Sequence, residues 1–174
     1  MKKNISFYER KVEEYRKKLI HNGEPQLSKV DKENLISFQD KYKNKRCFVI
    51  GNGPSLKSVD FSLLEKEYTF AANKIFLMFD KVRWRPTFYT SIDWRVTPTI
   101  LPEINSDLIP SSTIRLMPFR YKNFLKKREN DLFFPLVGGG FGFDREFQIN
   151  IHDIGATGRG SVLIQVIQLA FYMG

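Results

Sequence analysis

Residues 46–50 form an apolar run, Arg-Cys-Phe-Val-Ile, that stops abruptly at Gly51-Asn-Gly-Pro54. A short run that is apolar on both sides of the backbone and ends in turn-forming residues is typical of a strand buried in a parallel sheet. The chain has 174 residues, of which 42% are apolar, so it is long enough for one domain with a hydrophobic core. The run therefore predicts an α/β fold and excludes a disordered chain.

Further strands and helices alternate along the rest of the chain. Strands are expected at residues 68–72, 87–92, 114–117 and 132–137, with helical stretches near 61–67 and 121–130. Residues 161–173 are apolar nearly all round, too short to cross a bilayer, and so predict a buried helix. This order predicts a mainly parallel sheet with flanking helices.

The two ends of the chain differ from this middle part. Residues 1–45 predict a basic helical extension before a domain at 46–174, with a second helix that begins near Asp31 as its N-cap. One apolar stripe of the first helix comprises Ile5, Tyr8, Val12, Tyr15 and Leu19. Gly174 is expected just past the last helix, where a buried strand should follow, so we expect the domain to be C-terminally incomplete.

The turn after residues 46–50 is the strongest candidate site. Gly51 and Gly53 are expected to take positive φ and to let a ligand approach the backbone, whose exposed amides favour anions. Asn52 and Ser55 offer short polar side chains for ribose, base or phosphate oxygens. The alternative is an ordinary strand-to-helix turn, which uses the same residue types.

Two common nucleotide motifs are absent around this turn. Leu56 stands where G-x-G-x-x-G needs its third glycine, and Asn73 where an acidic residue is expected, which disfavours NAD. The sequence contains no G-x-x-x-x-G-K-[ST], which disfavours a Walker-type ATPase.

Polar residues also follow the next two predicted strands. Asn73 and Asp93 should share the carboxyl-end rim with the glycine turn, as a nucleotide crevice requires. Asp93 is suited to a sugar hydroxyl, a metal or a neighbouring arginine, and either residue is equally suited to a cap or turn.

A second glycine-rich segment precedes the last helix. Thr157 or Ser161 is expected to cap that helix, whose free amides, with Gly160 and Arg159, are suited to a phosphate; capping without a ligand is the alternative. Residues 138–143 alternate glycine and phenylalanine and predict a loop that covers a substrate.

Histidine and cysteine contribute little chemistry here. The single Cys47 excludes an internal disulfide and a cysteine-based zinc cluster, and with only His21 and His152 no metal site is expected. His152 beside Asp153 is more typical of a structural pair than of a catalytic one. Without a signal peptide or an apolar span, we expect a cytoplasmic protein.

Four segments in this order resemble one family: residues 48–56 (FVIGNGPSL), 70–74 (FAANK), 86–93 (PTFYTSID) and 160–174 (GSVLIQVIQLAFYMG). The family includes bacterial sialyltransferases of glycosyltransferase family 42. It also includes the MptE-like domain of flagellin motility accessory factors and of archaeal 6-hydroxymethylpterin diphosphokinase. The resemblance covers about residues 46–174 and implies a Rossmann-like nucleotide-binding domain.

The resemblance also implies roles for particular residues. In the sialyltransferases the first glycine turn and the asparagine after the second strand hold the CMP part of the donor, which carries over onto Asn52, Gly53, Ser55 and Asn73. Gly160 and Ser161 loosely match the segment near the phosphate. Those enzymes use no metal or other cofactor, and their acceptor-activating histidine lies beyond the last helix, so no catalytic base is assigned here.

The expected function is therefore binding of a nucleotide-sugar donor, CMP-linked or NDP-linked, for glycosylation of a bacterial surface polysaccharide or flagellin. Partners would be that nucleotide-sugar and a glycan or glycolipid acceptor. One alternative is pterin diphosphokinase chemistry, which needs ATP and Mg²⁺ with Asp93 as the only carboxylate at the rim. Another is a truncated, non-catalytic nucleotide-binding or scaffold module.

The basic charge predicts a further partner. The formal net charge is +9, and residues 1–46 hold 13 Lys or Arg against 7 Asp or Glu. No nucleic-acid-binding motif accompanies this excess, so we expect no nucleic acid but a peripheral contact with the anionic inner membrane; a solvated helix face is the alternative. The protein should sediment with anionic vesicles at low salt and less at high salt, and absence of binding at both would contradict this.

Overall fold

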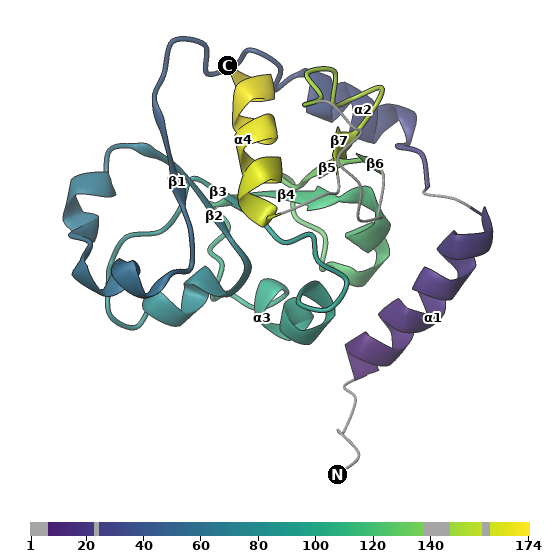
Figure 1. Cartoon of the computed structure of the whole chain (residues 1–174), viewed down its shortest axis with the longest axis horizontal. Helices are drawn as coiled ribbons and strands as arrows, with labels where there is room; N and C mark the ends of the chain where they lie inside the picture. The colour runs from purple at the N-terminus through teal and green to yellow at the C-terminus, as the bar shows by residue number, and fades with distance from the viewer. Residues whose placement is uncertain (1–6, 23–24, 138–146, 158–160) are drawn as a thin grey trace.

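The computed structural model describes residues 7–22, 25–137, 147–157 and 161–174, and its centre is a five-stranded parallel sheet (Figure 1). The strands follow one another in chain order across the sheet: β1 (Cys47–Ile50), β2 (Tyr68–Ala72), β3 (Phe88–Thr90), β4 (Ile114–Pro118) and β5 (Leu132–Phe134). Val49 lies opposite Phe70, and Phe70 opposite Phe88. The predicted α/β class with a mainly parallel sheet is confirmed.

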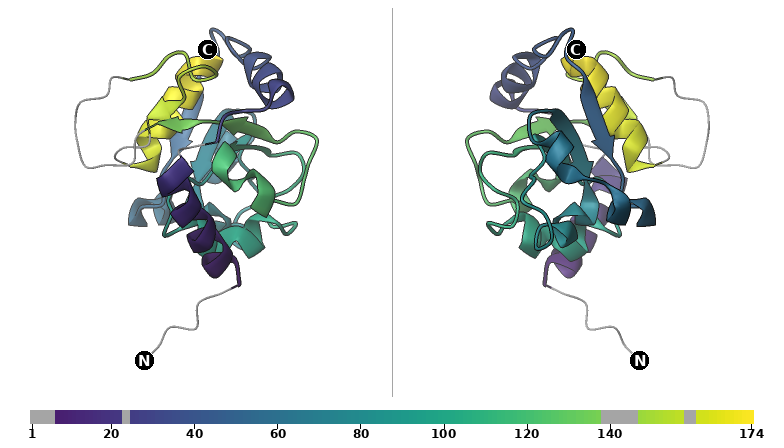
Figure 2. Two further views of the ribbon diagram at one scale, coloured as in Figure 1. Left: turned by 90° about the vertical axis from the view of Figure 1, so that its right-hand side faces the viewer. Right: turned by 90° about the vertical axis from the view of Figure 1, so that its left-hand side faces the viewer.

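Alternate side chains of each strand enter two separate cores, one on each face of the sheet. Phe70 and Leu116 point to the first core, which α2 (Lys29–Ile36) and α4 (Val162–Met173) cover. Their chain neighbours Ala71 and Met117 point to the second core. Short elements cover that face: η1 (Pro54–Ser58), η2 (Phe61–Leu64), η3 (Asn73–Met78), η4 (Thr97–Ile100), α3 (Leu101–Ile104) and η5 (Phe119–Phe124). Figure 2 shows the sheet edge-on between these layers.

The first helix, α1 (Phe7–Asn22), lies against the lower part of the domain (Figure 1). Its Val12 is buried in a third, small cluster with Leu101 and Tyr121. Among the described helices, none is both long and apolar enough to pass through a bilayer.

Three predicted elements differ from the observed ones. The single strand expected at residues 132–137 is divided at Pro135 into β5 and β6 (Leu136–Val137), and β6 pairs with β7 (Ala156–Thr157). A proline has no amide hydrogen for the ladder, which explains the break. The helices expected near 61–67 and 121–130 are the short 3-10 helices η2 and η5 instead.

The N-cap of α2 also differs from the prediction. Ser28, not Asp31, is the cap, and its hydroxyl oxygen accepts a hydrogen bond from the Asp31 amide at 3.2 Å. The Asp31 carboxylate pairs with Lys122 of η5, which ties α2 to the loop after β4. The last helix, α4, ends as predicted at Gly174, which has φ +91°.

Two elements that the sequence predicts to be buried are partly exposed. β1 is an end strand, so Cys47, Phe48 and Val49 are exposed rather than covered on both sides. On α4 the inner residues are buried, but Ile164, Ile167 and Phe171 are exposed. An apolar pattern shows which residues avoid water, but not whether this chain alone supplies their cover.

A buried ion pair closes the second core. The guanidinium of Arg115, on β4, donates to both oxygens of Asp131, from Nε at 2.7 Å and from Nη2 at 2.6 Å. It also donates to the carbonyls of Ile104 and Lys126 at 2.8 and 2.7 Å. The pair therefore links β4 to the end of α3 and to the segment before β5, and each guanidinium nitrogen donates at least one hydrogen bond.

Replacing Asp131 should leave the buried Arg115 guanidinium with no counter-charge. We expect Asp131→Asn to lower the free energy of unfolding by about 3–5 kcal/mol in urea denaturation. Asp80→Asn, at an exposed carboxylate with no ion pair to a described residue, should change it by less than about 0.5 kcal/mol. Equal effects of the two substitutions would contradict this role.

Candidate functional site

The glycine turn lies at the carboxyl end of β1, where the chain leaves the sheet for η1. Neither Gly51 nor Gly53 takes a positive φ, so that expectation was wrong; Gly53 has φ −76° and precedes Pro54, the first residue of η1. A Cβ at Gly53 would meet only the Ser55 hydroxyl, at 3.7 Å. The turn is therefore open because of missing side chains, not because of an unusual backbone.

Asn52 ties this turn to the neighbouring strand. Its side-chain amide nitrogen donates to the carbonyl of Ala72, the last residue of β2, at 2.8 Å. Asn52 and Ser55 are both exposed. The bond holds the Asn52 side chain beside the end of β2, and its carbonyl oxygen has no hydrogen-bond partner among the described residues.

Asn73 follows directly and has a left-handed backbone with φ +52°. Its carbonyl accepts from the Tyr89 hydroxyl at 2.8 Å, and its side-chain oxygen accepts from Ser91 at 3.0 Å. Ser91 in turn lies 2.8 Å from the Thr97 hydroxyl. This buried network fixes Asn73 in a conformation that asparagine tolerates better than most residues.

The sequence interpretation missed Tyr89, Ser91 and Thr97. All three are fully buried, and burial raises the pKa of the Tyr89 hydroxyl well above its ordinary value, so it remains a donor. The strand predicted at residues 87–92 placed Ser91 inside it, and only the observed end of β3 at Thr90 puts Ser91 at a strand end, as Asn73 is.

Asp93 stabilises a turn, which is one of the roles that the sequence suggested for it. Its Oδ1 accepts from the backbone amides of Arg95 at 2.6 Å and Val96 at 3.0 Å. It is not joined to Asn52 or Asn73 by any hydrogen bond of the described residues. Nor do three His, Cys, Asp or Glu side chains of that part of the chain gather into a metal-binding group.

The start of α4 reaches the glycine turn. Ser161 caps the helix, and its hydroxyl oxygen accepts from the Leu163 amide at 3.3 Å. A Cβ built on Gly51 would lie 3.5 Å from the Leu163 side chain. Two segments about 110 positions apart in the chain thus lie near each other at the carboxyl end of β1.

Thr157 does not cap α4 but lies buried in β7. Its backbone amide donates to Gln168 at 3.2 Å, and its carbonyl accepts from Gln165 at 2.6 Å. Its hydroxyl has no hydrogen-bond partner among the described residues, like that of Thr90 at the carboxyl end of β3. Arg159, Gly160 and the loop at 138–143 lie outside the described residues.

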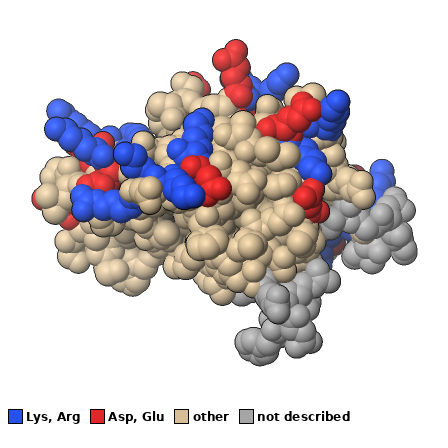
Figure 3. Space-filling view, turned by 90° about the horizontal axis from the view of Figure 1, so that it is seen from above, with Lys and Arg blue, Asp and Glu red and all other residues tan. Residues whose placement is uncertain are grey.

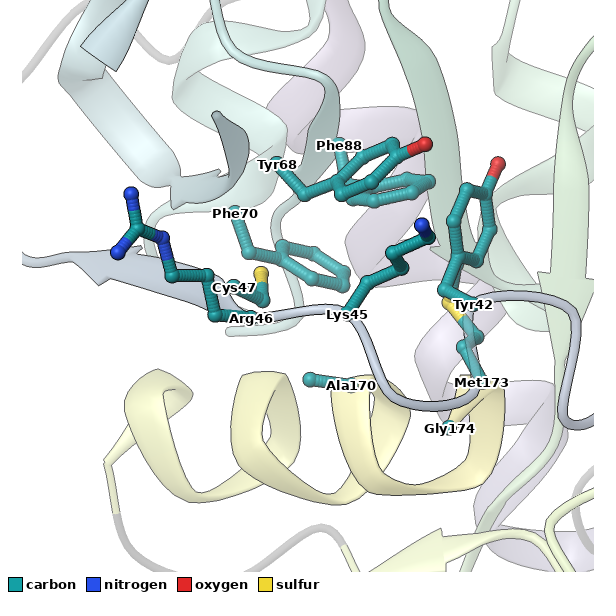
Figure 4. Close-up of a pocket in the computed structure, with 10 residues that line it drawn as sticks. All are labelled: Tyr42, Lys45, Arg46, Cys47, Tyr68, Phe70, Phe88, Ala170, Met173 and Gly174. Atoms are coloured by element: carbon teal, nitrogen blue, oxygen red, sulfur yellow. The ribbon is translucent and has the colours of Figure 1, made fainter. Parts of the chain in front are cut away.

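A pocket of about 170 Å³ lies at the opposite, amino edge of the sheet (Figure 4). Cys47, Tyr68 and Phe88, the first residues of β1, β2 and β3, line it together with Tyr42 and Ala170. Arg46 points away from it and pairs with Glu67. Cys47 is exposed at the edge of the sheet, but partial burial of its thiol in this pocket raises the pKa of the thiol to about 11.

His152 belongs to a structural link, as the sequence interpretation favoured. Its Nδ1 lies 3.0 Å from the Tyr172 hydroxyl, which donates to the carbonyl of Leu35 at 3.2 Å. Burial raises the pKa of Tyr172 to about 12. The link joins α4 to α2 on the first face of the sheet.

Comparison with known proteins gives no relative for this chain. No protein-family model matches it, and neither a curated protein nor a solved structure matches significantly.

The raised pKa of Cys47 should be visible in its alkylation rate. The thiolate is the reactive form, so the rate with iodoacetamide should rise about tenfold per pH unit and continue to rise up to about pH 11. In denaturant the rise should end about two pH units lower, near the ordinary pKa of a thiol. A folded protein whose rate levels off near pH 9 would contradict the burial of the thiol.

Proposed function

We propose that the carboxyl edge of β1 and β2 binds a nucleotide or nucleotide-sugar, and that the domain is a Rossmann-like glycosyltransferase domain. The observation that carries this proposal is the approach of the first turn of α4 to the glycine turn, since a Cβ built on Gly51 would lie 3.5 Å from the Leu163 side chain. Both segments carry backbone amides suited to a phosphate.

The arrangement of the connections supports the same place. After β1 the chain leaves to the face covered by the 3-10 helices, whereas α4 covers the other face beside β1 and β2. Ligands of open α/β sheets bind outside the carboxyl ends of the strands, so the carboxyl end of β1, flanked by η1 and α4, is the favoured place. The amides of the first turn of α4 add a positive dipole end there.

The side chains at this edge have complementary roles in the proposal. The exposed amides of Gly51–Gly53 and the N-terminus of α4 would hold phosphate oxygens. The side chains of Asn52 and Asn73, fixed by Ala72 and Ser91, would hydrogen-bond the ribose or base. Thr90, whose hydroxyl is buried without a partner among the described residues, is a further candidate donor beneath them.

The proposed reaction is transfer of the sugar to a glycan or glycolipid hydroxyl, with the nucleotide as leaving group. These residues would accelerate it by positioning the donor and by stabilising negative charge on the departing phosphate. Asp93 uses one carboxylate oxygen on two backbone amides, and this favours the transferase over a diphosphokinase that needs carboxylates for Mg²⁺.

Titration calorimetry with CMP, UDP, GDP, ADP and inorganic phosphate tests the proposal. One nucleotide should bind at least tenfold more tightly than phosphate, and Asn52→Ala should weaken it about tenfold because one or two hydrogen bonds are lost. Asn73→Gly should also weaken it while keeping the left-handed backbone, and therefore most of the stability.

The matched control is Asn34→Ala, at an exposed asparagine on α2. It should leave the affinity unchanged. If no nucleotide binds better than phosphate, or if Asn52→Ala binds as tightly as the unmodified protein, the proposed site is wrong.

A further inference from the structure

The helix α1 packs on the connections that leave the carboxyl ends of β3 and β4. Among the α1 residues whose burial is described, Val12 alone is buried, and it packs with Leu101 of α3 and Tyr121 of η5. A second contact joins the rings of Tyr15 and Phe124 of η5, whose centroids lie 5.6 Å apart. In chain order α3 follows β3 and η5 follows β4. The helix α1 therefore touches the same edge of the sheet as the proposed site, two strands farther along.

The apolar cluster under α1 is small. To its buried and partly buried members α1 contributes only Val12 and Tyr8. Charged side chains gather elsewhere: Figure 3 looks down onto the end of the sheet where β1 begins and shows Lys and Arg interspersed with Asp and Glu there. A helix held by so few buried apolar side chains opens at a lower free energy than the core of the domain.

Tyr121 connects this cluster to the chain that leaves β3. Its hydroxyl donates to the carbonyl of Ile92 at 3.3 Å, and its ring packs against Trp94 with centroids 5.6 Å apart. Asp93, between these two residues, closes the turn through its own hydrogen bonds to backbone amides. The backbone on both sides of Asp93 is thus held by η5 as well as by the turn itself.

The same turn separates the two hydroxyls that hold Asn73. The backbone amide of Thr97 donates to the carbonyl of Asp93 at 2.9 Å, which fixes Thr97 at the end of the turn. The Thr97 hydroxyl lies 2.8 Å from that of Ser91, which donates to the Asn73 side chain at 3.0 Å. Because these groups are closely packed and buried, a shift of the turn moves Ser91 and with it Asn73.

We propose that α1 is a regulatory helix for the carboxyl edge of the sheet. When α1 is docked, Tyr121 holds the turn at residues 91–97 and thereby the Asn73 side chain; when α1 is displaced, both loosen. Docked and undocked α1 are the two states that such coupling requires. The effect on the turn does not depend on what the edge binds, whereas an effect on nucleotide affinity rests on the proposed function.

Amide hydrogen exchange of the full chain, measured by mass spectrometry, tests the coupling. Val12→Glu places a charge in the apolar cluster and should displace α1. Exchange at residues 91–97 should then become at least about tenfold faster. The matched control Val30→Glu, at a 64% exposed valine on α2, should leave it unchanged. Faster exchange within α1 without a change at residues 91–97 overturns the proposal, and so does an α1 that stays protected in Val12→Glu.

Tyr121→Phe separates the coupling from a general loss of folding. It removes one hydroxyl and keeps the ring beside Val12 and Trp94. Circular dichroism and exchange within α1 should therefore be unchanged, while exchange at residues 91–97 should rise about fivefold, the effect of one hydrogen bond. Exchange at residues 91–97 that matches the unmodified protein contradicts the role of Tyr121 and with it the proposal.

Titration calorimetry with CMP, UDP, GDP and ADP distinguishes this inference from the proposed function. Val12→Glu should bind the preferred nucleotide at least about fivefold more weakly than Val30→Glu does, and by reciprocity that nucleotide should slow exchange within α1. If the unmodified protein binds none of the four, the proposed function fails, and exchange at residues 91–97 alone decides the coupling. A nucleotide that binds Val12→Glu and the unmodified protein equally well overturns the regulation.

Discussion

Burial of both faces of one parallel sheet is the constraint on which the rest of this structure depends. Each strand directs alternate side chains into two cores, so Phe70 and Ala71 need cover from opposite sides. Short elements between successive strands cover one face, and α2 and α4 are the main helices that cover the other among the described residues. α4 packs over β1 and β2, at one end of the sheet. In the chain α4 comes after β5, which lies at the other end of the sheet.

The proposed site is a consequence of that division. With α4 on one face and η1 on the other, the carboxyl end of β1 is where backbone amides from both come together. The hydrogen bond from Asn52 to Ala72 and the network from Asn73 to Ser91 then fix two side chains whose positions the folded sheet determines. A ligand at the proposed site would therefore meet side chains that the fold already fixes, which would reduce the entropy lost on binding.

The same division leaves β1 as the less protected edge. α2 covers β5, and no described element covers the outer edge of β1. The exposed strand and the exposed stripe of α4 lie together because α4 packs against β1.

The sequence by itself determined most of the local structure. Most strand positions and the end of α4 at Gly174 followed from apolar runs and from turn residues, because these depend on neighbours within a few positions. The cap of α4 was narrowed to Thr157 or Ser161. The position of Asn73 at a strand end followed from the same reasoning.

Tertiary structure alone decided which strand lies at the edge, that α4 is covered on one side only, and that Arg115 meets Asp131. It also decided that Asp93 serves a turn while Asn52 reaches the end of β2. These features depend on residues brought together from distant parts of the chain, and a local pattern shows only that a residue needs a partner, not which partner the fold provides.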